Sequence, residues 1–199
     1  MTYRLTIGID PGLTGAVTTL LDGVPGPMID MPTRKVGDWG EVDAAALAKF
    51  IREQRAAHPG AYVSACVEKV AARPGDGGTS AFRFGQTAGK IQAVLEVLGI
   101  PYTRSIPAVW KREFGLIGTD KDAARLLAIK RFPSAAHLLT RKKDNGRADA
   151  LLIGLWHENT QLGTFDSAAK GEGDHGGEGG NTSNAGSTRA RTHVCGEAA

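Results

Sequence analysis

Apolar runs separated by turn residues fill the first third of the chain and indicate a sheet. Three such runs, divided by Pro and Gly turns, predict strands over residues 4–10, 16–21 and 27–31. Their short connections favour an antiparallel meander. Residues 42–57 carry apolar side chains at helical spacing, and the next apolar run, 62–67, predicts another strand. Because a crossover helix leads to it, we expect this strand to pair in parallel with the first one.

Helical patterns dominate the remainder of the ordered region. They predict a long helix over residues 81–98, followed by a strand over 100–106. A short helix begins at Pro107, and two further helices are predicted over residues 121–131 and 151–156. The sequence therefore predicts an α/β fold in which helices flank a mixed sheet. We expect one domain, residues 1–162, and a disordered tail, residues 163–199, which is rich in Gly, Ser and Asn and lacks apolar periodicity.

Single carboxylates stand at the ends of the buried elements. Asp10 ends the first strand, and Glu68 ends the strand at 62–67. Parallel pairing of these two strands would place both acids side by side. Asp149 lies near the start of the last apolar helix, where an unpaired acid is costly unless a group such as a metal ion compensates it. Asp10 as an ordinary turn residue and Asp149 as a partner of the helix dipole are the alternatives.

The residue types of these motifs narrow the chemistry. Acids alone suit Mg²⁺ or Mn²⁺, and two such ions per site would activate a water and stabilise the leaving oxygen of a phosphodiester. The motifs contain no His or Cys, which argues against zinc or a cysteine nucleophile. The chain also lacks a Gly-x-x-x-x-Gly-Lys-Ser/Thr phosphate loop.

Charge and targeting patterns concern the partner and the compartment. The formal net charge is +3, and removal of the acidic tail leaves a more basic body, which favours a polyanionic partner. The sequence shows no membrane-spanning run, no signal-peptide pattern and no disulfide framework. We therefore expect a cytoplasmic protein.

Basic residues flank the acidic motifs. Lys111, Lys121 and the run Arg141-Lys142-Lys143 are candidates to hold phosphates, although such a run can also be a solvated surface. The Gly-rich loop at 72–80 contains Arg73 and is either a plain connector or a loop that touches a ligand.

Six short motifs, in this order along the chain, resemble those of RuvC-type Holliday junction resolvases, in a form typical of phage-encoded members. Gly8-Ile-Asp-Pro-Gly12 resembles the first acidic motif, and Val67-Glu68 with Val70 resembles the second. Residues 84–89 resemble the family's segment after the second acid. Residues 107–111 and 119–121 resemble two stretches that supply DNA-contacting lysines, and residues 147–151 resemble the terminal acidic helix. The resemblance covers nearly all of residues 4–158 and includes the order of elements of the ribonuclease-H-like fold.

This resemblance implies a mixed five-stranded sheet and a homodimeric endonuclease that resolves four-way DNA junctions by paired symmetric nicks. Asp10, Glu68 and Asp149 would bind two Mg²⁺ ions, or Mn²⁺ in their place. Gly146 occupies the position of the family's fourth metal ligand, and Asp144 is the predicted substitute. The expected DNA contacts are Lys111, Lys121, Arg73, Phe82, Arg83, Arg141, Lys142 and Lys143.

Two further expectations come from the same comparison. The family's junction-probing aromatic residue is replaced by Ala71, so Phe82 or Phe84 is a candidate for the stacking role, and core packing is the alternative use of at least one of them. The smooth stripe of Gly85 and Gly89 on the helix at 81–98 would let another backbone approach closely, either within the fold or from a second copy, and we expect this helix to contribute to a dimer. For a phage-encoded protein the location would be the host cytoplasm.

Three alternatives remain at this stage. The same acids would serve a nuclease that acts on other branched DNA or on R-loops. The Asp-Pro-Gly-Leu-Thr-Gly turn also resembles the first phosphate loop of sugar kinases and actin-like ATPases, which need a second similar lobe. The third alternative is a DNA-binding module that has kept the fold without catalysis.

Overall fold

A computed structural model describes residues 3–69, 71, 75 and 77–170. The strands are β1 (Arg4–Asp10), β2 (Ala16–Leu21), β3 (Val24–Asp30), β4 (Thr33–Val36), β5 (Trp39–Val42), β6 (Tyr62–Glu68) and β7 (Tyr102–Ser105). The α-helices are α1 (Ala44–Ala57), α2 (Gly78–Val97), α3 (Pro107–Glu113), α4 (Ala123–Arg131) and α5 (Asn145–Lys170). Two 3₁₀ segments, η1 (Pro133–Leu138) and η2 (Lys142–Asp144), lead into α5.

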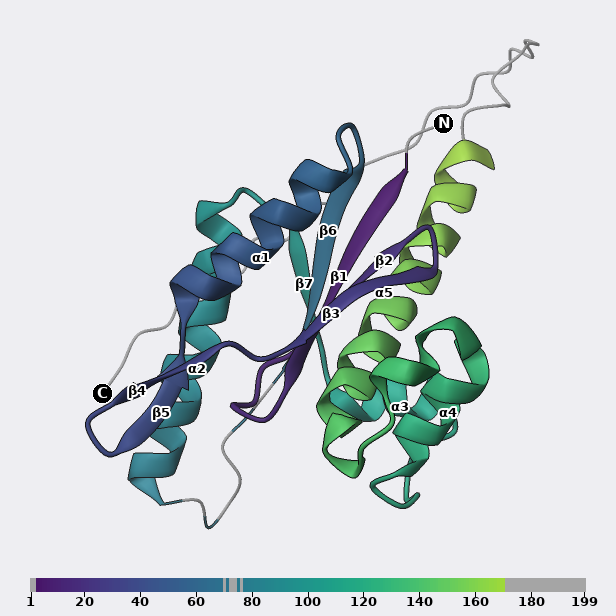
Figure 1. Cartoon of the computed structure of the whole chain (residues 1–199). Helices are drawn as coiled ribbons and strands as arrows, with labels where there is room; N and C mark the ends of the chain where they lie inside the picture. The colour runs from purple at the N-terminus through teal and green to yellow at the C-terminus, as the bar shows by residue number, and fades with distance from the viewer. Residues whose placement is uncertain (1–2, 70, 72–74, 76, 171–199) are drawn as a thin grey trace, which may run out of the picture.

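A mixed five-stranded sheet in the order β3-β2-β1-β6-β7 forms the centre of the molecule. The β1–β2 and β2–β3 pairs are antiparallel, whereas β6 pairs in parallel with both β1 and β7. Helices α1 and α2 lie on one face of the sheet, and α3, α4 and α5 lie on the other (Figure 1). The structure confirms the predicted fold class and the predicted pairing of the strands.

Two features were not predicted from the pattern of apolar residues. The first is the hairpin β4–β5, which pairs outside the main sheet. All four residues of β4 are exposed, so no apolar alternation marked this strand. The second is the length of α5, which begins at Asn145 and continues through residues 163–170 of the predicted tail. The rest of that tail, residues 171–199, lies outside the described residues.

Alternation along β1 gives its two faces different neighbours. Ile7 and Ile9 belong to the core cluster under α1 and α2. Gly8 faces α5, and a Cβ at this position would collide with the carbonyl oxygen of Ala150 and lie 2.8 Å from the nitrogen of Gly154. The missing side chain therefore lets α5 lie directly against β1, which brings the start of the helix to the end of the strand.

Within the described residues, no helix is long and apolar enough to cross a membrane. The same residues form one central sheet and one small hairpin sheet. They do not include the second similar lobe that the kinase-like alternative requires.

Candidate active site

Carboxylates from three elements meet at the end of the sheet where β1 and β6 finish and α5 begins. Asp10 and Glu68 are the last residues of these two parallel neighbours. Gly8 and Cys66 face α5, and they stand two positions before Asp10 and Glu68. Because side chains alternate along a strand, both acids lie on the face that α5 covers. Asp149 approaches them from the first turns of α5. The three principal acids predicted from the sequence are thus brought together.

Burial raises the pKa values of all three acids, and repulsion from neighbouring carboxylates raises those of Glu68 and Asp149 further. Burial raises the pKa of Asp10, although a hydrogen bond from the Gly12 N–H to Oδ1, 3.3 Å long, opposes the change. Burial and then the charge of Asp10 raise the pKa of Glu68. Burial raises the pKa of Asp149 to about 7, with additional contributions from Asp10 and Glu68. The site therefore concentrates negative charge that a cation would stabilise.

The charges of these acids shift one another's pKa values, but their side chains do not surround one point in space. Among the described residues, no three His, Cys, Asp or Glu side chains are gathered closely enough to surround a metal ion. Like-charged carboxylates repel one another when no cation lies between them, which is consistent with this spacing.

Helix α3 supports the site with two consecutive side chains. Trp110 is fully buried, and its Nε1–H donates a 3.0 Å hydrogen bond to Oε1 of Glu68. The Nζ atom of Lys111 lies 5.1 Å from the centre of the Trp110 ring, and its positive charge partly opposes the rise in the pKa values of all three acids. The sequence pointed to Lys111, but the orienting role of Trp110 was missed; its only signal was its place directly before that lysine.

A cavity of about 330 Å³ opens beside Asp149. Lys111 and Lys121 line it together with Asp149, so two of the four lysines predicted to contact DNA share a cavity with an acid of the site. Asn145, one helical turn before Asp149, lines the same cavity. Sequence reasoning missed Asn145, although its spacing of four residues from Asp149 was a readable signal.

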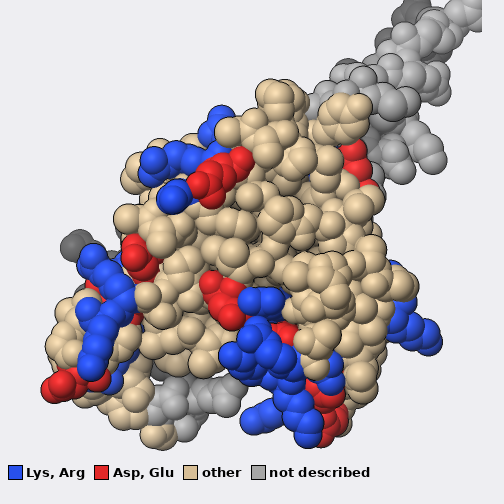
Figure 2. Space-filling view, viewed as in Figure 1, with Lys and Arg blue, Asp and Glu red and all other residues tan. Residues whose placement is uncertain are grey.

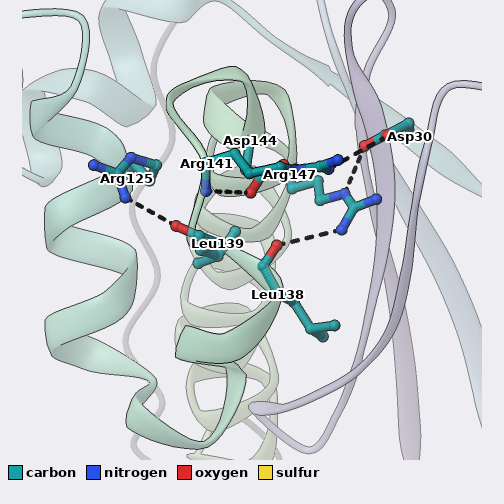
Figure 3. A network of polar contacts seen from close by, with 7 residues as sticks. All are labelled: Asp30, Arg125, Leu138, Leu139, Arg141, Asp144 and Arg147. Atoms are coloured by element: carbon teal, nitrogen blue, oxygen red, sulfur yellow. Dashed lines mark hydrogen bonds and ion pairs between the residues drawn. The ribbon is translucent and has the colours of Figure 1, made fainter.

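Asp144 has a different set of neighbours (Figure 3). Its carboxylate is 1% exposed and accepts hydrogen bonds from the backbone N–H, Nε and Nη2 of Arg141, at 2.7, 2.9 and 2.6 Å. Burial acts to raise the pKa of Asp144, but the hydrogen bonds from Arg141 hold it below its usual value. The charges that raise the pKa values of Glu68 and Asp149 do not include Asp144. Both of its oxygens therefore serve the loop that leads into α5.

The neighbouring arginines bind this loop to β3 (Figure 3). Arg147 pairs with Oδ1 of Asp30 at 2.5 Å and donates a 3.3 Å hydrogen bond to the carbonyl of Leu138. Nη2 of Arg141 lies 3.8 Å from the other oxygen of Asp30. Arg141, predicted to contact DNA, thus has two acidic partners inside the protein.

The other predicted DNA contacts come from different elements. Phe82 on α2 is 68% exposed, and the guanidinium of Arg83 lies 4.6 Å from the centre of the Trp39 ring in the hairpin. Lys142 and Lys143 are exposed in η2, and Arg73 lies outside the described residues. Figure 2 shows Lys and Arg side chains, mixed with acids, in the lower part of the view, at the end of the molecule where β1 and β6 finish.

Comparison with known proteins places this geometry in context. No family model matches the chain. A stretch of 114 residues, 57% of the chain, is 36% identical to the chloroplastic Holliday junction resolvase MOC1 of Chlamydomonas reinhardtii, and the alignment spans 13% of that protein.

One solved structure has a similar fold, and a second structure of the same protein gives a lower score. Thermus thermophilus RuvC in complex with a Holliday junction substrate has a TM-score of 0.52 and 17% identity, over 81% of this chain and 97% of that one. A second T. thermophilus RuvC structure gives a TM-score of 0.48 and 18% identity, over 81% and 98%. Sequence similarity to a Holliday junction resolvase and a fold like that of RuvC confirm the resemblance predicted from the motifs.

Proposed function

We propose that the chain is a metal-dependent endonuclease that resolves four-way DNA junctions by paired symmetric nicks. The observation that carries this proposal is the group of Asp10, Glu68 and Asp149, whose pKa values are all raised at one end of the sheet. The similarity to a Holliday junction resolvase supports the substrate class.

The donor set fits hard divalent cations. Three partly buried carboxylates offer only oxygen ligands, which Mg²⁺ and Mn²⁺ prefer. Asp10, Glu68 and Asp149 would hold the metal, whose positive charge would stabilise acids that otherwise repel one another. Two ions bound there would supply an activated water and charge neutralisation at the leaving oxygen, so that the products carry 5′-phosphate and 3′-hydroxyl ends. We leave Asp144 out of this set because Arg141 engages both of its oxygens.

The chain's own residues have distinct tasks in this proposal. Trp110 fixes the orientation of the Glu68 carboxylate through its hydrogen bond. Lys111 and Lys121, which line the cavity beside Asp149, hold the phosphates that flank the cut. Exposed Lys142 and Lys143 add weaker contacts to the DNA backbone.

A two-fold dimer matches the symmetry of a four-way junction, because two paired cuts need two related active sites. Helix α2 supports this part of the proposal. Phe82 and Val97 are exposed on it, and Cβ atoms added at Gly85 and Gly89 would meet no atom of the described residues within 4 Å. We propose that this smooth apolar surface faces the second copy.

The dimer is tested by measuring the mass of the chain in solution with junction DNA present. Gly89→Arg should shift the protein toward the monomer because a long cation would enter the interface. Glu53→Arg, on the exposed surface of α1, is the control and should not change the mass. A wild-type chain that stays monomeric at micromolar concentration with junction DNA would refute the dimer.

The activity is tested with a labelled immobile four-way junction and a linear duplex, with and without Mg²⁺. Paired symmetric nicks by the wild type, and none by Asp149→Asn, are expected. Equal cutting of the linear duplex would support the metal site but refute the junction specificity. Preferential cutting of Y-shaped DNA or R-loops would indicate that another branched DNA is the substrate. Binding without cutting in both Mg²⁺ and Mn²⁺ would indicate a DNA-binding module without catalysis.

A further inference from the structure

Asn145 occupies a position at the proposed metal site that no motif pointed to. It is the first residue of α5 and lies one helical turn before Asp149, so both side chains are on the same side of the helix. Both line the cavity of about 330 Å³ that Lys111 also borders. Asn145 is therefore placed beside one of the acids that would hold a cation.

The side-chain oxygen of Asn145 accepts no hydrogen bond from any residue that the structure describes. Among the described residues, the buried side-chain oxygens without a hydrogen bond belong to Thr18, Asn145 and Glu158, and of these only Asn145 lines this cavity. A buried acceptor without a partner destabilises the fold, and such groups in folded proteins commonly serve a ligand or an ion. Rotation about the Cβ–Cγ bond exchanges the oxygen and nitrogen ends of the amide without moving the helix.

The adjacent positions cannot provide this oxygen. A Cβ at Gly146 would lie 2.7 Å from the carbonyl oxygen of Thr14 and 2.9 Å from the Cα of Gly15, so the backbone of the β1–β2 turn excludes any side chain there. The carboxylate of Asp144 is bound by Arg141. Of the three residues at the entry to α5, only Asn145 presents an uncommitted oxygen at the cavity.

We propose that Asn145 supplies a fourth, neutral oxygen ligand to the divalent cation held beside Asp149. This inference rests on the metal site of the proposed function. Amide oxygens are ordinary ligands of hard cations. A neutral fourth ligand also completes the oxygen set without adding a negative charge to three acids that already repel one another.

The test is calorimetric titration of the full chain with Mn²⁺, without DNA. Asn145→Ala should weaken Mn²⁺ binding by roughly tenfold or more. Asn145→Asp retains an oxygen at this position, suits the start of a helix and adds a charge, so it should bind Mn²⁺ at least as tightly as the wild type. Thermal unfolding of each metal-free variant checks that the fold is intact.

Asn159 provides a matched control because it is an exposed asparagine on the same helix. Asn159→Ala and Asn159→Asp should leave Mn²⁺ affinity unchanged. If Asn145→Ala binds Mn²⁺ as the wild type does, or if Asn145→Asp binds no better than Asn145→Ala, the ligand role is refuted while the proposed metal site stands. If the wild-type chain itself binds no Mn²⁺, the metal site is refuted together with the ligand.

Discussion

Replacement of Asp144 by asparagine separates a structural role from a metal-binding role at the entry to α5. The carboxylate is buried and accepts three hydrogen bonds from Arg141, two of them from the charged guanidinium (Figure 3). Asparagine keeps one acceptor oxygen and loses the charge. A hydrogen bond to a charged group contributes about 1.5–3 kcal/mol, so the free energy of unfolding at pH 7 should fall by roughly that amount. Because the Arg141 side chain is 46% exposed, water replaces part of the interaction and favours the lower end of this range.

The pH dependence gives this prediction a second, independent signature. The pKa of Asp144 in the folded chain lies below its ordinary value of 3.8, so the ionised carboxylate stabilises the fold above that pH. This stabilisation is lost as the pH falls through the lower, folded-state pKa. The difference between wild type and Asp144→Asn should therefore be largest near neutral pH and should narrow at pH values below 3.8.

Urea unfolding at several pH values measures the stability, and Mn²⁺ titration measures the metal site. Asp122→Asn is the control, because Asp122 pairs with Arg125 at the same sequence spacing but is more exposed, and a smaller loss of stability is expected. Asp144→Asn should leave Mn²⁺ affinity close to that of the wild type. Unchanged stability combined with a tenfold or greater loss of Mn²⁺ affinity would refute this reasoning and restore Asp144 as a metal ligand.

Three further predictions test the helix contact, the orientation of Glu68 and a buried histidine. Gly8→Ala should lower the free energy of unfolding by about 1–3 kcal/mol, because its Cβ would push α5 away from β1, and urea unfolding measures the loss. Trp110→Phe should reduce the rate of junction cleavage by roughly tenfold while the chain stays folded, because Glu68 loses its hydrogen-bond donor. An unchanged rate would show that Trp110 does not orient Glu68 for cleavage. Burial lowers the pKa of His157 below 6.5, so the unfolded chain binds the proton more readily and stability should fall as the pH drops below 6.5. His157→Gln should flatten this part of the stability profile, and an equal slope in both proteins would assign it to another group.

Much of the fold was predictable because its strongest signals are local. The apolar runs of β1, β2 and β6 stand between clear turn residues, and the connection through α1 implied the parallel pairing that brings Asp10 beside Glu68. The hairpin β4–β5 was not predictable from apolar periodicity, because it lies outside the main sheet and β4 is fully exposed. Its contacts are polar instead, such as the ion pairs of Glu41 with Arg34 and with Lys90 of α2.

The sequence predicted the acids of the candidate site but not the partners of Asp144. The acids of the three motifs follow from strand ends and a helix start, which the sequence marks directly. The partners of Asp144 do not follow, because an acid that binds a metal and an acid that binds an arginine look the same in a sequence. Arg141 stood in a basic run typical of a surface that holds phosphates, and only the structure shows that it turns back toward Asp144 and Asp30.

Three glycines explain why the site has its shape, and their role becomes clear only in three dimensions. Gly8 and Gly154 let the backbones of β1 and α5 touch, and Gly146 lets the start of α5 lie against the β1–β2 turn. The same close approach brings Asp149 to Asp10 and closes position 146 to any side chain. The contact that assembles the acids therefore also removes one position from which a fourth ligand would come. An uncommitted oxygen one residue earlier, on Asn145, is what this backbone geometry leaves for that task.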